Sequence, residues 1–298
     1  MTVLATDSRD RIVPGMFASA AAMLMFTVMN AFAKHLSTNH SVIEIAFYRN
    51  VFACLPFLAA IFLFGRRDIL VIKTKPQLVI TRAMLGTVSL ALTFAAYAQM
   101  PMAETSVLLF TASLFLPVLG VLILREHVGP YRWSAVLIGF VGVAIMANPT
   151  GAINPIGLGF ALAAAFMQAI LGVILRHLGA FERPETIAFY FFVIGTLLTG
   201  LAMPFVAQPF DISELPLWLG VGLSGAAAQW LYSIALKLAP AAVVAVLNYT
   251  NLIWAMLIGW LVWGDWPTSV VFVGAAVVIS SNLIIVWRES RSVTTVVR

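Results

Sequence analysis

Charge is scarce in this chain, since Asp, Glu, Lys and Arg together make up 10% of its 298 residues. Soluble domains carry about one quarter charged residues, so this composition excludes an ordinary soluble domain. Cysteine is nearly absent too: Cys54 stands alone, and an intrachain disulfide is therefore impossible.

Sites for metals, nucleotides and catalysis are also lacking in the sequence. The four histidines occur without cysteine pairs or carboxylate clusters that would complete a metal site. There is no Walker loop for ATP, and no nucleophile, base and oxyanion donor occur together. We therefore expect no metal and no cofactor, and an enzyme acting within the membrane is disfavoured.

Apolar residues, by contrast, are abundant, at 62% of the chain with a mean hydropathy of +1.01. Stretches of roughly 20 uncharged residues, long enough to cross a hydrocarbon core of about 30 Å, follow one another along the whole sequence. They predict an all-α membrane protein with no soluble domain and ten transmembrane helices, over residues 14–34, 43–64, 77–97, 102–124, 131–148, 156–175, 186–206, 216–236, 240–263 and 267–287.

The formal net charge of +5 is spread unevenly over the loops. Positive residues in short loops mark the cytoplasmic side of a membrane protein. With the amino terminus inside, the outer loops carry only Lys34. We therefore expect both termini in the cytoplasm and no nucleic-acid partner, with the inner segments holding Arg9, Arg11, Arg66, Arg67, Lys73, Lys75, Arg125, Arg132, Arg176, Arg183, Lys237, Arg288, Arg291 and Arg298.

One four-residue word, Ile-Ala-Phe-Tyr, occurs at 45–48 and again 142 residues later at 187–190. Identities at this offset extend back to Gly15, which meets Gly157. Further along, an offset of 139 aligns Pro, Ala, Thr, Gly and acidic residues: Pro101 with Pro240, Ala103 with Ala242, Thr111 with Thr250, Gly120 with Gly259, and Glu126 with Asp265. The chain is thus interpreted as a duplication.

The duplicated unit comprises five spans, so the two repeats are residues 1–149 and 150–298. Because five is odd, the second repeat starts on the opposite side of the membrane, and the two repeats have inverted topology. Inverted repeats are typical of secondary transporters, whose substrate lies near the midplane between the halves. A structural membrane protein without transport is the alternative.

The hairpins of the two repeats resemble the twin EamA repeats. One runs from Gln99-Met-Pro101-Met-Ala103-Glu104 to Leu124-Arg125-Glu126, and the other runs from Leu238-Ala-Pro240-Ala-Ala242 to Gly264-Asp265. EamA proteins form the ten-helix branch of the drug/metabolite transporter superfamily, whose fourth helix usually ends in Gly-Glu. An Arg early in the second helix, here Arg49, is also typical of the family, although its counterpart in the second repeat is Phe191.

This resemblance covers essentially the whole chain and implies a multi-pass protein of the bacterial inner membrane with a small-molecule substrate. Within the family, the chain is most similar to bacterial exporters of the YddG type, which carry aromatic amino acids. A monomer is expected, and the sequence leaves a dimer open.

Polar residues within the spans are the candidates for lining a path, because polar groups in hydrocarbon are costly and face the interior or a wet cavity. In the ninth span, two amides three residues apart share a face with Ala255 and Gly259, which would leave room for a ligand. The predicted substrate-binding residues are Asn30, Tyr97, Gln168, Gln229, Tyr232, Asn248, Asn251 and Trp254. Ordinary hydrogen bonding between helices is the alternative for each of them.

Three further residues are candidates for a gate or hinge. Arg49 and Arg82 each lie close to a span end, where snorkelling to the interface is the favoured interpretation. The alternative is a gate charge or a clamp on a substrate carboxylate, which a guanidinium suits. Pro117 lies in the middle of the fourth span, where it is expected to bend the helix without a counterpart in the second repeat.

These features predict a secondary transporter that exports small metabolites by alternating access. Neutral amides and aromatic rings favour amino acids with aromatic or other apolar side chains as substrates. The interior shows no mid-membrane carboxylate, so we expect no obligatory ion coupling, with Glu104 as the one shallow alternative. A coupled antiporter of drugs or nucleotide-like metabolites is the competing prediction.

Overall fold

A computed structural model describes residues 9–124, 129–147, 154–178 and 181–296, most of which are helical. No strand occurs in these residues. The α-helices are α1 Arg9–Leu36, α2 Val42–Leu63, α3 Pro76–Gln99, α4 Met102–Leu109, α5 Ala112–Leu124, α6 Pro130–Met146, α7 Pro155–Leu178, α8 Pro184–Gly200, α9 Met203–Val206, α10 Leu215–Leu238, α11 Ala241–Leu247, α12 Thr250–Trp263 and α13 Ser269–Val296, and the 3-10 helices are η1 Arg67–Leu70 and η2 Ile212–Glu214.

Local sequence signals account for several helix ends. The Ser41 hydroxyl accepts a hydrogen bond from the Glu44 backbone N–H at 3.1 Å and so caps α2. Proline occupies the first position of α3, α6 and α8, where its missing N–H leaves no bond unmade. Gly264 ends α12 in the left-handed conformation, with a φ of 72°.

The prediction of ten membrane spans is confirmed by the helices. Seven helical stretches of the described residues are long and apolar enough to cross a membrane, and three shorter apolar helices, over 133–146, 184–200 and 269–284, complete the set. Large apolar side chains such as Phe62, Phe205 and Leu261 are more than 70% exposed on the outside of the bundle, as a surface that faces lipid requires.

Each repeat contains one broken span, which the sequence did not predict as such. The fourth span is divided into α4 and α5 at Phe110, and the ninth is divided into α11 and α12 after Asn248. At both breaks a threonine hydroxyl donates to the carbonyl three residues earlier: Thr111 to Leu108 at 2.6 Å, and Thr250 to Leu247 at 2.7 Å. These threonines correspond at the offset of 139, so the breaks are a feature of the repeat.

The bend expected at Pro117 is therefore misplaced. Pro117 lies inside α5, and the break precedes it at Phe110. The carbonyl of Phe110 accepts hydrogen bonds from the Ser113 backbone N–H at 3.2 Å and the Ser113 hydroxyl at 2.7 Å, and a further one of 3.2 Å from the Asn282 amide of α13. A distant helix thus adds a hydrogen bond to the backbone at the break, and apolar sequence patterns carry no trace of that contact.

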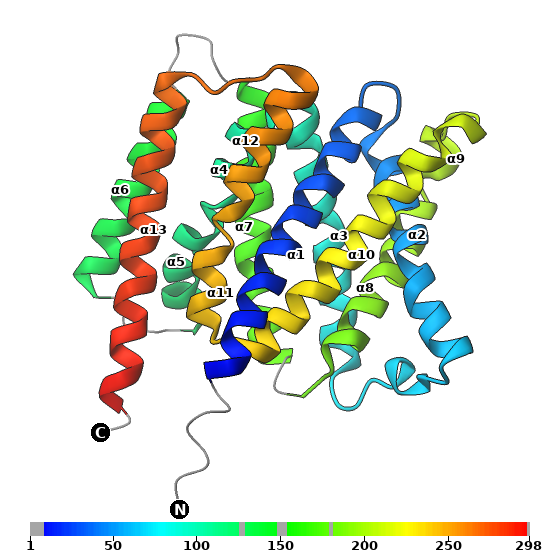
Figure 1. Cartoon of the computed structure of the whole chain (residues 1–298), viewed down its shortest axis with the longest axis horizontal. Coiled ribbons are helices and arrows are strands. Elements are labelled where there is room, and N and C mark those ends of the chain that lie inside the picture. Colours follow the sequence, from blue (N-terminus) through cyan, green and yellow to red (C-terminus); the bar gives the residue numbers. More distant parts are fainter. Residues whose placement is uncertain (1–8, 125–128, 148–153, 179–180, 297–298) are drawn as a thin grey trace, which may run out of the picture.

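Helix packing follows the duplication, because the helices exchange partners between repeats (Figure 1). The pair formed by α1 and α10 matches the pair formed by α7 and α3, and α2 with α10 matches α8 with α3. At the edge of the bundle α6 and α13 lie side by side, where Gly142 and Gly274 allow their backbones to approach. These small residues therefore pack against each other within the monomer.

At one face of the bundle, the helix contacts do not come in repeat-related pairs. Near the face opposite the termini, α1 packs against α3 and α4 packs against α12, with Ala31, Tyr97, Met102 and Ala255 in one buried cluster. The exchanged pairs, α7 with α10 and α5 with α11, show no comparable packing in the described residues. The helices of the two halves therefore pack together more closely at that face, the closed face, than at the other. The first turn of α1 and the last turn of α13 both lie at the other face (Figure 1).

Equivalent loops of the two repeats make polar contacts between the halves at both faces. At the closed face, His40 lies 3.1 Å from the Glu44 carboxylate and 2.7 Å from that of Glu214. At the other face, the repeat-equivalent residue Glu182 accepts backbone hydrogen bonds from Lys73 at 3.0 Å and Thr74 at 2.8 Å. Burial alone would raise the pKa of Glu182, but these backbone donors outweigh burial and hold the pKa below its usual value.

Candidate functional site

A cavity of about 380 Å³ lies at the centre of the bundle between the two repeats. This volume suits a small metabolite. Its lining comes from α1, α2, α3, α4, α7, α8, α10 and α12 and from the two helix breaks at Phe110 and Asn248. It combines amides, hydroxyls, two guanidiniums and aromatic rings. None of the described residues that line it is acidic.

The structure brings most of the predicted binding residues to this one cavity. Seven of the eight line it: Asn30, Tyr97, Gln168, Gln229, Tyr232, Asn248 and Asn251. Trp254 does not, and its indole N–H is buried without a partner. Pro117 is also absent from the lining. Trp254 lies three residues after Asn251 in the same helix, α12, but this spacing does not bring its ring to the cavity.

The small residues of α12 serve a different purpose from the one expected. Ala255 is completely buried in a cluster with Tyr97 and Met102, and Gly259 lies opposite Met102 as well. They allow α12 to approach α4 at the closed face instead of leaving room for a ligand. The expectation of ligand space beside Ala255 and Gly259 is therefore wrong.

Hydrogen bonds within the cavity wall satisfy some of the polar groups. Tyr97 and Ser106 share a hydrogen bond of 2.9 Å, and the Asn251 side-chain oxygen accepts from Thr27 at 3.2 Å. Other groups remain open: the side-chain oxygens of Asn30 and Asn248 are buried without a partner. An unpaired buried acceptor costs free energy, so these two amides are available to a ligand that brings a donor.

The two arginines do not snorkel, which corrects the favoured interpretation. Arg49 is 2% exposed and Arg82 is 7% exposed, and both line the cavity. Distance along the helix to the interface misled the prediction, because both side chains lean inward over the rings of α8. The Arg49 Cζ lies 5.2 Å from the Phe191 ring centroid and 4.8 Å from that of Phe192, and the Arg82 Cζ lies 4.5 Å from Phe191.

Neither guanidinium has a carboxylate partner in the described part of the chain. Arg49 donates through Nη1 to the Asn50 side chain at 2.9 Å, but its Nε has no partner. Arg82 has neither Nε nor Nη1 satisfied. Cation–π contacts are worth about 2 kcal/mol at best, whereas burying an unpaired charge costs several kcal/mol. The two charges are therefore under-compensated.

Two aromatic residues on this site escaped the sequence analysis, and both are marked by the repeat. Phe191 is the counterpart of Arg49, and the two are in contact. Phe110 and Tyr249, which correspond at the offset of 139, stack with ring centroids 4.8 Å apart. Equivalent residues touch only where they straddle the pseudo-two-fold axis. Aligning the repeats would have located both pairs on that axis.

Comparison with known proteins agrees with this architecture. The sequence model of the EamA-like transporter family matches residues 13–148 and 155–287. The chain belongs to the EamA-like transporter family. A riboflavin transporter of Rhizobium johnstonii is 31% identical to this EamA protein over 95% of the chain and 94% of its own length.

Other relatives of this EamA protein carry different names. An S-adenosylmethionine uptake transporter of Rickettsia prowazekii is 24% identical over 92% of each chain. The pseudopaline exporter CntI of Pseudomonas aeruginosa is 25% identical over 91% of this chain and 95% of its own. One solved structure, described only as "Crystal structure of protein", has a TM-score of 0.60 at 17% identity, covers 92% of this chain and 98% of its own, and shows the same fold. This EamA protein is a membrane-embedded small-molecule transporter and not an enzyme.

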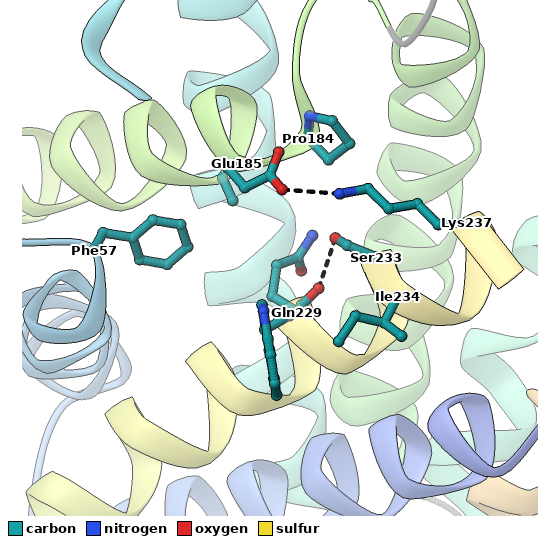
Figure 2. Close-up of a pocket in the computed structure, with 9 residues that line it drawn as sticks. Phe57, Pro184, Glu185, Gln229, Ser233, Ile234 and Lys237 are labelled. Carbon is teal, nitrogen blue, oxygen red and sulfur yellow. Dashed lines mark hydrogen bonds and ion pairs between the residues drawn. The ribbon is translucent and has the colours of Figure 1, made fainter. Parts of the chain in front are cut away.

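A smaller hollow lies beside the cavity of this EamA protein, between α2, α8 and α10 (Figure 2). Gln229 belongs to the lining of both. The backbone carbonyl of Gln229 accepts a hydrogen bond of 2.8 Å from Ser233, and an ion pair of 2.9 Å joins Lys237 of α10 to Glu185 of α8. The Gln229 side chain is therefore part of the wall that separates the cavity from the side of the bundle.

Proposed function

We propose that this EamA-family protein exports a small organic metabolite through the central cavity by alternating access. The observation that supports this most is the one-sided closure of a polar cavity between inverted repeats. In the other state, the contacts of α1 with α3 and of α4 with α12 would separate, and α7 would pack with α10 and α5 with α11. This change would close the present opening and open the other face.

Amino acids with aromatic or other apolar side chains are the first substrate class that we propose, as the closer likeness to aromatic amino acid exporters implied. The amides would receive the polar head, and the rings of Phe26, Phe110 and Tyr232 would receive the side chain. The names of the relatives widen the set to riboflavin, S-adenosylmethionine and pseudopaline, so all of these belong in the first panel.

The decisive experiment is counterflow with purified protein in liposomes, using that panel of labelled compounds. We expect saturable uptake of at least one compound, above that of empty liposomes, and loss of the signal at excess unlabelled substrate. If no compound moves through correctly inserted, monodisperse protein, the transport proposal fails for this panel.

The orientation that we propose places both termini in the cytoplasm, so the cavity faces inward in this structure. The positive residues of the inner loops support it. Reporter fusions to the carboxyl terminus and to the loop at residues 207–214 test it, because the two fusions must report opposite sides. A periplasmic carboxyl terminus would contradict the orientation.

We further propose that transport needs no coupling ion, because no acidic side chain lines the cavity in the described residues. A coupled antiporter is the second candidate, and Glu104 supports it: this carboxylate is 5% exposed and its Oε2 has no partner. Uptake at equal substrate gradient, with and without an imposed proton gradient, separates the two. Uptake that requires the proton gradient and disappears in Glu104→Gln would establish coupling.

A further inference from the structure

Two positive charges face the cavity with nothing in its wall to balance them. Arg49 and Arg82 come from different helices, α2 and α3, and both guanidiniums lie against the ring of Phe191. Their nitrogens Nε of Arg49 and Nε and Nη1 of Arg82 are buried without partners. Buried charges in proteins are normally paired, so this pair lacks its counter-charge.

The rest of the protein cannot supply that counter-charge from the described residues. The acidic side chains of the two faces already have their own partners: Glu44 and Glu214 bind His40, and Glu182 binds the backbone of Lys73 and Thr74. Asp68 pairs with Arg66 and Arg183, Glu185 with Lys237, and Asp265 lies near Lys34. Glu104 lies at the closed face and is not part of the cavity lining.

The site is built to hold the guanidiniums in place. A Cβ at Gly225 would lie 3.1 Å from the Arg49 Nε, and a Cβ at Gly86 would lie 3.0 Å from the Phe191 ring. These glycines correspond at the offset of 139, so each repeat provides a small residue where the other repeat places a large one. The Asn50 side chain, itself fully buried, fixes one edge of Arg49 through the bond to Nη1.

From these observations we infer that the substrate carries a net negative charge and that its acidic group, a carboxylate or a phosphate, docks between Arg49 and Arg82. Guanidiniums bind such oxyanions through paired, charge-assisted hydrogen bonds. The inference rests on the proposed transport function and puts anionic metabolites before zwitterionic amino acids as its substrate class. A zwitterion fits less well, because no acidic side chain among the described lining residues is available for its ammonium group.

The test compares ligands that share one phenyl body and differ in charge. Binding to the purified full-length protein is measured by thermal shift and calorimetry for hydrocinnamate (anion), hydrocinnamamide (neutral), phenylalanine (zwitterion) and phenethylammonium (cation). Phenyl phosphate tells a phosphate from a carboxylate site. We expect an anion, whether hydrocinnamate or phenyl phosphate, to bind at least about tenfold more tightly than the amide, with the cation weakest.

Variants then attribute the preference to the two side chains. Arg49→Gln and Arg82→Gln should each reduce anion affinity at least about tenfold and leave amide affinity unchanged. Their melting temperatures without ligand should stay level or rise, because a buried unpaired charge is removed. Arg183→Gln, at an exposed ion pair outside the cavity, is the matched control and should change nothing in binding.

The results separate this inference from the transport proposal. Three results would each overturn the inference. The anion and the amide could bind equally tightly, phenylalanine could bind more tightly than the anions, or the Gln variants could lose affinity for all ligands to the same extent. If both Gln variants fail to fold, Arg49→Lys and Arg82→Lys replace them: retained anion preference supports the inference, and its loss in both counts against it. Anion binding without counterflow overturns only the transport proposal, and counterflow of neutral or zwitterionic compounds without anion preference overturns only the inference.

Discussion

The two repeats agree in their helices and differ in the side chains that they turn toward the cavity. The bounds of α3 and α10 correspond residue for residue at the offset of 139, and the two helix breaks correspond to within one residue. At the cavity, however, Arg49 faces Phe191, while Arg82 corresponds to Val221 and Asn251 to Ala112. The repeat therefore determines how the halves move and pack, whereas the differences between repeats determine what the cavity binds.

Placing an arginine at position 191, opposite Arg49 across the pseudo-two-fold axis, should have the largest effect on stability. Phe191→Arg would place a third guanidinium within about 5 Å of Arg49 and Arg82, where like charges repel by about 3 kcal/mol per pair at an effective dielectric constant near 20. We expect this variant to lose most of its stability. The double variant Arg49→Phe/Phe191→Arg exchanges the pair and should recover a large part of the melting temperature. A double variant as unstable as Phe191→Arg would show that the two positions are not interchangeable.

The two glycines next to this pair should respond in parallel. Gly225→Ala pushes on Arg49 and Gly86→Ala pushes on Phe191, and both contacts are with side chains that can shift. We expect each substitution to lower the free energy of unfolding by about 1–3 kcal/mol. Gly225→Ala should also weaken anion binding, while Gly159→Ala, where a Cβ meets nothing within 4 Å, is the control. Chemical denaturation of the three variants measures the difference.

The loop contact that Glu182 makes should weaken in acid. The pKa of Glu182 is lowered in the folded protein, so its contribution to stability is present above the unfolded pKa of about 4.3 and is lost as the pH falls below it. We expect Glu182→Gln to be destabilised by about 1–2 kcal/mol at pH 7 and to approach wild type near pH 3. A gap of the same size at both pH values would mean that the charge of Glu182 contributes nothing.

The amides contributed by the second repeat should affect transport more than stability. Asn248→Leu and Gln229→Leu should change the free energy of unfolding by less than about 1 kcal/mol, because membrane amides are worth little as packing groups. Both should alter the transport rate or the choice of substrate in the liposome panel. Trp254→Phe, outside the cavity lining, is expected to transport normally. Normal transport of the whole panel by both amide variants would make these residues structural.

The sequence predicted the number of spans, the inverted repeat and the amides and tyrosines of the cavity wall, because lipid demands long apolar helices and concentrates polar side chains in the interior. It failed at Phe110 and Asn248, where the helices break. Those breaks involve hydrogen bonds from threonine hydroxyls and, at Phe110, from Asn282 of a distant helix. The hydrophobicity of the sequence does not change across them.

The side-chain errors have similar physical causes. The direction in which Arg49 and Arg82 lean is decided by the rings of α8, which are remote in sequence. Phe191 carries no polar signal in an apolar span, so only its alignment with Arg49 could have drawn attention to it. Trp254 was placed by its spacing of three residues from Asn251 in α12, but a shared side of a helix does not fix which of its side chains reach the cavity.

The contact between Arg49 and Phe191 also explains why a fused chain differs from an assembly of two identical five-helix subunits. On a true two-fold axis a residue meets its own copy, so a homodimer of the first repeat would bring Arg49 against a second Arg49. A homodimer of the second repeat would bring two phenylalanines together and offer no guanidinium at that position. Duplication lets the two copies mutate independently, so that one charged and one aromatic residue can share the axis. Splitting the chain between residues 149 and 150 and coexpressing the halves should therefore favour the heterodimer over either homodimer.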